Sequence, residues 1–273
     1  MNNPKPNITI PVDLNNPGQF FACCGLLELA DRLWPGAEGW FEEKRFHLRF
    51  AGNISELFAR AILDCPLELT HIQNLQVKRI IAPLKIILDG GALPPFILDF
   101  WVRVGKQNGQ MQAIGNTPWN LWSGQQTPLG IWNQLRSALR EIVPKLGSID
   151  ESVGIFNLMA PLTGRFGFDS SAAWNAQDLG FSPNIQSISV DSSPVTELLA
   201  AIGLQRFLPR RVAQGEMFAY AIWKVPASPM IAASASCGAV TLSDDNYEFA
   251  IISRGRYAAF KKATQIQGDL PHG

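Results

Sequence analysis

Residues 16–34 read NPGQFFACCGLLELADRLW and predict a central, buried helix. Asn16 suits the N-cap, Pro17 suits the first helical position, and Gln19 completes a capping-box arrangement. The stretch is apolar almost all round as far as Leu27, which is typical of a helix inside a domain. Glu28 and Asp31 follow as the polar face of its last turns.

A second helix that also begins with a capping residue followed by proline is predicted after Ser193-Pro194, over VTELLAAIGLQRFL. Both helices carry alanine three residues before a Gly-Leu pair, in Ala22-x-x-Gly25-Leu26 and in Ala200-x-x-Gly203-Leu204. Glycine inside a helix costs about 1 kcal/mol relative to alanine. The echo therefore indicates either close packing of another backbone on each helix, or a coincidence between two buried helices.

The remaining periodicity predicts a mixture of strands and helices. Predicted strands cover Phe46–Phe50, Leu84–Leu88, Phe96–Val104 and the alternating segments 217–225, 229–236 and 247–253. Further helices are predicted after Asn53, where Glu56 assists the cap, and after Thr127-Pro128, with an end marked by Pro144 and Gly147. We expect a single α+β domain, 1–273, with a mixed or mostly antiparallel sheet and about four helices. A subdivision near Gly147, into 1–147 and 148–273, is the alternative.

Composition describes a well-buried globular protein, with 47% hydrophobic and 17% charged residues among 273. The net charge of zero argues against a protein that grips nucleic acid alone, because that binding is largely phosphate neutralisation. The polar N-terminus has no signal-peptide pattern and no apolar run is long enough to span a membrane, so we expect a cytoplasmic location. The four cysteines lack CxxC spacing and read as free, buried thiols.

Catalytic patterns are scarce. The histidines, His47, His71 and His272, do not pair with each other or with Cys or carboxylates at metal-ligand spacing. No nucleotide-binding, metalloprotease or serine-hydrolase motif occurs, and Asp244-Asp245 lies in a predicted turn. We therefore expect no enzymatic activity, no catalytic residues, no metal and no cofactor.

Recognition features are better represented, above all in residues 162–186, LTGRFGFDSSAAWNAQDLGFSPNIQ. The aromatic residues predict an ordered surface loop pinned to the body, because a disordered segment has few of them. Arg165 in GRFG could meet phosphates or belong to a tight turn, and Trp174 could stack on a base or anchor the loop. Asn184 and Gln186 are residue types that hydrogen-bond adenine edges.

Basic residues gather near the C-terminus, where residues 203–273 carry eight Lys or Arg and five Asp or Glu. Arg206, Arg210 and Arg211 follow the predicted second helix, where the helix dipole also favours cations. Basic and aromatic residues interleave in SRGRYAAFKK, as nucleic-acid backbones with stacked bases require, although a solvated chain end explains them equally well. The candidate nucleic-acid-binding residues are Arg165, Trp174, Asn184, Gln186, Arg206, Arg210, Arg211, Arg254, Arg256, Lys261 and Lys262.

Three segments together resemble one protein family. They are PVDLNNPGQFFACCGLLELADRLWPGAEGWF (11–41), GRFGFDSSAAWNAQDLGFSPNIQ (164–186) and PVTELLAAIGLQRFLP (194–209). The chain is similar to the small, large-subunit-like Cas proteins of the Csb-three family, found in type I-U (now I-G) CRISPR systems.

The resemblance implies a non-catalytic subunit of an RNA-guided surveillance complex in antiviral defence. Such a subunit contributes to recognition of the motif that flanks the DNA target and to assembly, while guide pairing reads the sequence, a division of labour known in another effector. The implied partners are other effector subunits, guide RNA, target DNA and a recruited helicase–nuclease.

Two other classes of function remain open at this stage. The chain could be a purely structural adaptor whose exposed Trp and Phe contact only protein. It could also be an enzyme on small molecules or carbohydrates, with the Trp-rich region Trp119–Trp132 as a stacking platform and two converging carboxylates.

Overall fold

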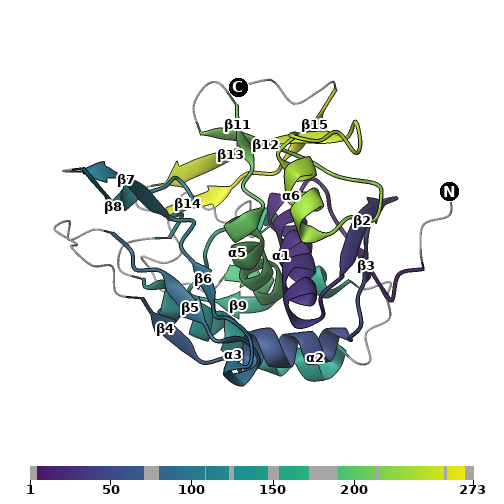
Figure 1. The fold of residues 1–273 in the computed structure, drawn as a ribbon, viewed down its shortest axis with the longest axis horizontal. Helices are drawn as coiled ribbons and strands as arrows, with labels where there is room; N and C mark the ends of the chain where they lie inside the picture. Colours follow the sequence, from purple (N-terminus) through teal and green to yellow (C-terminus); the bar gives the residue numbers. More distant parts are fainter. Residues whose placement is uncertain are drawn as a thin grey trace.

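A pair of adjacent helices, α1 (Pro17–Leu33) and α5 (Pro194–Arg206), forms the centre of the fold in the computed structural model (Figure 1). The structure describes residues 5–70, 80–107, 109–122, 126–146, 154–171, 190–212, 216–254 and 257–267, without the side chains of 107, 143–146, 254 and 257. The fold is α+β, as the sequence predicts.

Small antiparallel sheets surround the two helices. The N-terminal sheet has the order β1-β3-β2, from β1 (Ile8–Pro11), β2 (Glu38–Glu42) and β3 (Arg45–Arg49). A second sheet has the order β4-β5-β6, from β4 (Leu67–Leu69), β5 (Leu84–Ile86) and β6 (Phe96–Leu98). Two two-stranded pairs are β7 (Val102–Gln107) with β8 (Gln110–Asn116), and β9 (Ala160–Leu162) with β10 (Val190–Ser192).

The last third of the chain forms the largest described sheet, which Figure 1 shows above the two central helices. Its path is β11-β12-β13-β14, with β15 also paired to β13. The strands are β11 (Arg210–Arg211), β12 (Met217–Ala221), β13 (Asn246–Arg254), β14 (Tyr257–Phe260) and β15 (Thr264–Ile266). The other helices are α2 (Ile54–Phe58), α3 (Pro128–Leu146) and α6 (Pro229–Ser236).

The two central helices touch backbone to backbone at their glycines. A Cβ on Gly25 would lie 2.0 Å from the carbonyl oxygen of Leu199, and a Cβ on Gly203 would lie 2.0 Å from that of Phe21. Each glycine therefore admits the other helix, which is the close approach that only a residue without a side chain permits. Of the two explanations for the sequence echo, close packing is confirmed.

The contact between α1 and α5 also fixes their direction. Both helices begin beside Asp169, which accepts hydrogen bonds from the side chain of Asn16 and from the backbone N–H of Ser193. Their last turns meet again through an ion pair between Glu28 and Arg206. The helices therefore run in the same direction, and each end of the pair is closed by a polar cluster.

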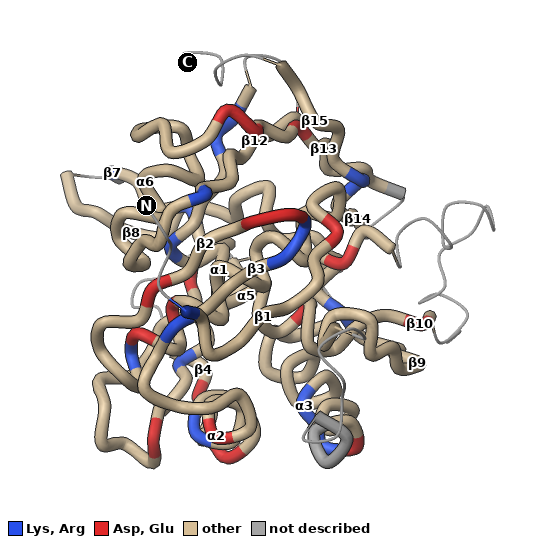
Figure 2. The backbone as a smooth tube through the Cα atoms, turned by 90° about the vertical axis from the view of Figure 1, so that its right-hand side faces the viewer, with Lys and Arg blue, Asp and Glu red and all other residues tan. Residues whose placement is uncertain are grey.

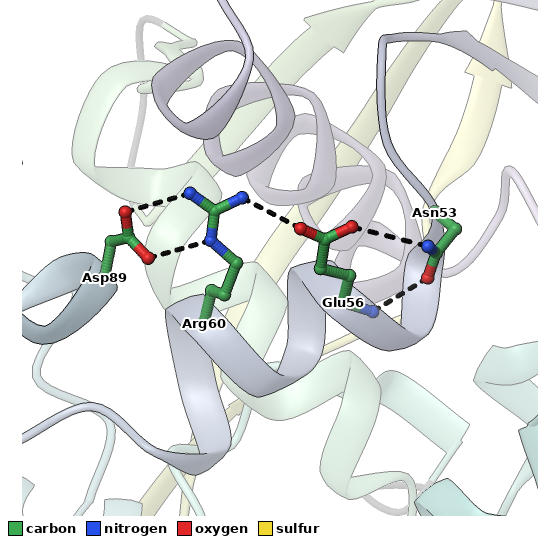
Figure 3. Close-up of polar contacts among 4 residues, drawn as sticks. All are labelled: Asn53, Glu56, Arg60 and Asp89. Carbon is green, nitrogen blue, oxygen red and sulfur yellow. Dashed lines mark hydrogen bonds and ion pairs between the residues drawn. The ribbon is translucent and has the colours of Figure 1, made fainter.

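Helix α2 starts as predicted and continues into a π-helical turn, Ala59–Leu63. The side chain of Asn53 accepts from the Glu56 N–H at 2.9 Å, and Arg60 links Glu56 to Asp89 (Figure 3). The Arg60 guanidinium donates two hydrogen bonds to the Asp89 carboxylate, which lies in a turn at φ 49°. This network attaches α2 to the connection between β5 and β6.

A continuous hydrophobic core draws on both 1–147 and 148–273, since it includes residues from Ile10 to Ala263. Its centre is aromatic: Phe20 of α1 stacks on Tyr220 of β12, with ring centroids 4.1 Å apart. Phe249 of β13 packs edge to face on Phe21. The C-terminal sheet is thus bound directly to the first helix of the chain.

Several local predictions are wrong for identifiable reasons. Gln19 does not close a capping box on Asn16, because its side-chain oxygen accepts from the N–H of Asp13 instead. The predicted strand Phe96–Val104 is interrupted at Asp99, whose carbonyl accepts from the Val102 N–H in a turn. Helix α3 passes through Pro144, one of its two predicted stop signals, and ends at Leu146, directly before the other, Gly147.

Residues 229–236, PMIAASAS, form helix α6 and not a strand. Pro229 occupies the first turn, and the buried positions Pro229, Ala232, Ala235 and Ser236 recur at helical spacing. Small residues on both faces gave this segment an alternating pattern that does not distinguish the two structures. The thiols of Cys23, Cys24 and Cys65 are free and buried as predicted, and Cys237 is free and half-buried.

The glycine contact gives a first prediction. Gly25→Ala or Gly203→Ala places a methyl group against a backbone carbonyl, so each variant should lose about 3 kcal/mol of unfolding free energy. Urea unfolding followed by tryptophan fluorescence measures this loss. Gly130→Ala is the matched control, because its Cβ meets only the side-chain oxygen of Thr127, at 3.1 Å. An equal loss in all three variants would contradict the backbone contact.

Candidate nucleic-acid interface

The first part of the predicted recognition loop, Leu162–Ser171, is largely interior. Phe166 and Phe168 are fully buried and stack on each other with centroids 5.6 Å apart. Phe166 also contacts the ring of Trp122, and Phe168 contacts Phe260 of β14. The prediction of aromatic anchoring is confirmed for these residues, whereas their placement in a surface loop is wrong.

One buried carboxylate organises the backbone of this segment. Glu197, in the first turn of α5, accepts hydrogen bonds from the N–H groups of Phe166, Gly167 and Asp169, at 2.9 to 3.0 Å. Gly167 has φ 94°, a conformation that glycine adopts without strain. Burial raises the pKa of Glu197, and the neighbouring Asp169 adds to that rise, while the N–H groups and Arg165 oppose it.

Asp169 completes the cluster at the start of the two helices. Its carboxylate accepts from Asn16, Ser171 and the backbone of Ser193, and Asn16 in turn accepts from the N–H of Ser170. The positive ends of two helix dipoles face these acids, which stabilises negative charge there. The polar residues of the loop are therefore engaged in joining α1 to α5.

Arg165 lies beside this interior cluster and is less exposed than a surface-loop position implies, while its contact with a partner stays a prediction. The residue is half-buried, and its Nη1 nitrogen is enclosed with no hydrogen-bond partner among the described residues. Burial lowers the pKa of its guanidinium, while Glu197 and Asp169 act in the opposite direction. Its positive charge compensates the two buried carboxylates.

Arg206 lies at the opposite end of the central helices, in a triad with Glu28 and Arg32. The Glu28 carboxylate accepts from the Nε of Arg206 at 2.5 Å and from the Nε of Arg32 at 2.7 Å. The Glu28 side chain is only 2% exposed, so its reading as part of a polar surface face is wrong. The side chain of Arg206 stays 42% exposed.

The other described basic candidates gather on the C-terminal sheet. Arg210 is paired with Ala219 and Ala219 with Glu248, while Lys261 donates its N–H to Ala250. Because opposed residues share a face and successive residues alternate, Arg210 and Lys261 lie on the outer face of the sheet, together with Glu248. Arg211 and Lys262 are also exposed, although Arg211 is opposite the inward-facing Phe218, and Arg254 ends β13.

Trp174, Asn184, Gln186 and Arg256 lie outside the described residues. The structure therefore places Arg210 and Arg211 at one edge of the C-terminal sheet, on β11, and Lys261 and Lys262 after β14, with β12 and β13 between the two pairs. It separates Arg165 and Arg206 from them and from each other. Sequence reasoning missed Arg32, whose only signal was the spacing of four residues from Glu28, a distance at which opposite charges pair on a helix.

The Trp-rich region is not a stacking platform. Trp119, Trp122 and Trp132 have exposed fractions of 7%, 3% and 0%. Trp122 meets Trp101 edge to face, and Trp119 packs on Phe218 of β12. These rings form core between α3 and the C-terminal sheet, so the feature on which the carbohydrate-enzyme alternative relied is wrong.

Comparisons with protein-family models, with curated proteins and with solved structures find no match to this chain. Within the described ranges, no helix is both long and apolar enough to cross a membrane. The described His, Cys, Asp and Glu side chains form no group of three or more that could hold a metal ion.

The interior cluster gives a second prediction. Glu197→Ala leaves three buried N–H groups without an acceptor, so the unfolding free energy should fall by about 3 kcal/mol or more. Chemical denaturation at neutral pH measures it, with the exposed Glu216→Ala as the control. A loss no larger than that of the control would contradict the role of this carboxylate.

The same residue gives a pH dependence. Since burial raises the pKa of Glu197 in the folded chain, the folded state keeps a proton that the unfolded chain has already lost. This group's contribution to stability is therefore fully present below the ordinary glutamate pKa and is lost as pH rises through the folded value. Between the ordinary glutamate pKa and the raised pKa of folded Glu197, the slope of unfolding free energy against pH should be less negative in Glu197→Ala than in the parent chain.

Proposed function

We propose that the protein is a non-catalytic subunit of an RNA-guided type I CRISPR surveillance complex, acting in the cytoplasm in antiviral defence. In this proposal it contributes to recognition of the motif that flanks the DNA target and to assembly of the complex. Its partners are the other effector subunits, the guide RNA, the target DNA and a recruited helicase–nuclease.

The observation that carries the proposal is the cationic outer side of the C-terminal sheet. Arg210, on the edge strand β11, and Lys261, after β14, lie on the same face of that sheet with β12 and β13 between them, and Arg211 and Lys262 are exposed. Cations presented on a rigid sheet can neutralise the phosphates of a nucleic-acid backbone, which is the main source of such affinity. Glu248 lies on the same face and limits the net positive charge.

The overall charge distribution favours binding within an assembly. Lys and Arg are interspersed with Asp and Glu along the described part of the tube in Figure 2, and the net charge is zero. A local cationic face on a neutral protein gives weak affinity by itself, and neighbouring subunits that bind the same strand raise it through effective concentration.

An exposed apolar segment around α6 supports contact with protein neighbours. Val225, Met230, Ile231 and Val240 are 45%, 70%, 48% and 44% exposed. Exposed apolar side chains within one short segment are typical of protein interfaces. The same observation favours the second candidate function, a purely structural adaptor, which lacks only the nucleic-acid contact.

The described parts of the segments that carry the family resemblance lie largely in the interior of the fold. Two of them supply α1 and α5, and the third supplies Glu197's backbone partners and Asp169. The resemblance therefore concerns residues that specify how the chain packs, and the surface contacts have to be tested directly.

Isolation of the native assembly tests the proposal. A tagged copy expressed in its own host should co-purify with effector subunits and with short RNAs that share a constant sequence. Sequencing the RNA and identifying the proteins by mass spectrometry provides the measurement. Recovery of protein neighbours without RNA would favour the adaptor, and recovery of the chain alone would contradict both functions.

Charge reversal tests the sheet face. In the assembled complex, Arg210→Glu combined with Lys261→Glu should weaken target-DNA binding about tenfold or more, because phosphate contacts become repulsive. The slope of log affinity against log salt should decrease by about 0.9 for each lost contact. Arg45→Glu combined with Lys44→Glu, at the exposed turn between β2 and β3, changes the charge equally and serves as control. Equal binding by all complexes would contradict this face.

A further inference from the structure

A pocket of about 460 Å³ opens at the C-terminal end of the central helices. Its lining residues are Glu28, Arg32, Pro95, Phe96, Ile97, Gln205 and Arg206. It is therefore built by the last turns of α1 and α5 together with β6 and the residue before it. This volume lies within the range of small-molecule sites.

The charges of the residues that line the pocket do not sum to zero. Two guanidinium groups line it with one carboxylate, Glu28, which is 2% exposed and paired with both. One arginine is enough to compensate a buried glutamate, so the second leaves a surplus positive charge at the wall. The side chains of Arg32 and Arg206 stay 30% and 42% exposed.

Both arginines also have N–H groups that do not donate to Glu28. Arg32 donates to Glu28 through Nε, and Arg206 donates through Nε and Nη2. Among the described contacts, both terminal nitrogens of Arg32 and the Nη1 of Arg206 have no hydrogen-bond acceptor. Paired guanidinium donors suit the oxygens of a phosphate group.

The pocket is held rigidly before any ligand arrives. The Arg32 guanidinium lies 4.2 Å from the centroid of the Phe96 ring. Gln205 is held at three hydrogen bonds, since its oxygen accepts from the N–H of Asp99 and of Phe100 and its Nε2 donates to the Asp99 carboxylate. Rigid donors lose little conformational entropy on binding.

We infer that this pocket binds one nucleotide unit of a single-stranded nucleic acid, with its phosphate between Arg32 and Arg206. The inference rests on the proposed function and adds a second contact point to it, at the end of α5 rather than on the outer face of the sheet. Arg32, held on Phe96, presents the kind of planar cation on which a base stacks. The pocket's volume leaves room for that base.

Titration of the purified chain tests the pocket. A fluorescently labelled hexanucleotide should bind at low salt, and Arg32→Gln and Arg206→Gln should each weaken binding about ten- to hundredfold, as expected for the loss of charged hydrogen bonds. Each variant leaves Glu28 with one arginine, and thermal unfolding checks that the fold is retained. Arg206→Lys keeps the charge and should recover part of the affinity, and thermal unfolding of this variant shows whether the recovery exceeds any change in stability.

Arg49→Gln is the matched control. Arg49 forms an ion pair with Glu38 in the N-terminal sheet, so this variant removes an equal charge and also breaks an Arg–Glu pair. Hexanucleotide affinity should stay within twofold of the parent. Equal weakening by Arg49→Gln, no hexanucleotide binding by the parent, or tighter binding of inorganic phosphate or a polyglutamate peptide than of the hexanucleotide would each overturn the pocket assignment.

Failure of the pocket and failure of the proposed function are distinguishable. If the assembly co-purifies with guide RNA while Arg32→Gln and Arg206→Gln bind the hexanucleotide normally, the pocket is wrong and the proposed function stands. If the two variants lose hexanucleotide binding while no effector subunit or guide RNA co-purifies, the pocket binds nucleotides and the proposed complex is wrong.

Discussion

At Gly25 and Gly203 the backbones of α1 and α5 touch, and a side chain at either position would lie against a carbonyl oxygen of the other helix. This contact sets the separation and direction of the two helices, and the neighbouring features depend on it. Because the helices are parallel, their N-termini meet at Asp169 and their C-termini at Glu28 and Arg206. The sheet strands then pack aromatic side chains against the remaining surface of α1.

The two ends of this helix pair use polar residues differently. At the N-terminal end, the carboxylate oxygens of Glu197 and Asp169 accept hydrogen bonds from backbone N–H groups and neighbouring side chains, so this cluster stabilises the fold. At the C-terminal end, two arginines share one carboxylate and retain donors toward a pocket. The chemistry available to a partner is therefore found where the helices end, and on the adjoining C-terminal sheet.

The helices at the centre could be predicted because their signals are local: Asn16-Pro17 and Ser193-Pro194 cap them, and apolar residues surround them. The glycine echo left close packing and coincidence open, and the structure shows that the two helices pack on each other at these glycines. Arg165 could not be recognised as interior, since its two compensating acids depend on tertiary contacts with α5 and with the loop backbone. The pocket could not be predicted from the sequence either, because Arg32 and Arg206 meet only through Glu28, which the sequence pattern places on an exposed face of its helix. Residues 229–236 failed because their small side chains fit either period.

The helix pair joins two segments that lie far apart in the chain, Pro17–Leu33 and Pro194–Arg206, and this has a consequence for biosynthesis. Helix α1 leaves the ribosome long before α5 has been translated, yet all but two of its residues are buried in the finished protein. Non-local contacts of this kind close slowly and expose apolar surface meanwhile. During most of translation, α1 is therefore without its partner helix and its apolar surface is uncovered. Chaperones that bind hydrophobic segments are expected to bind this nascent chain until α5 has been synthesised.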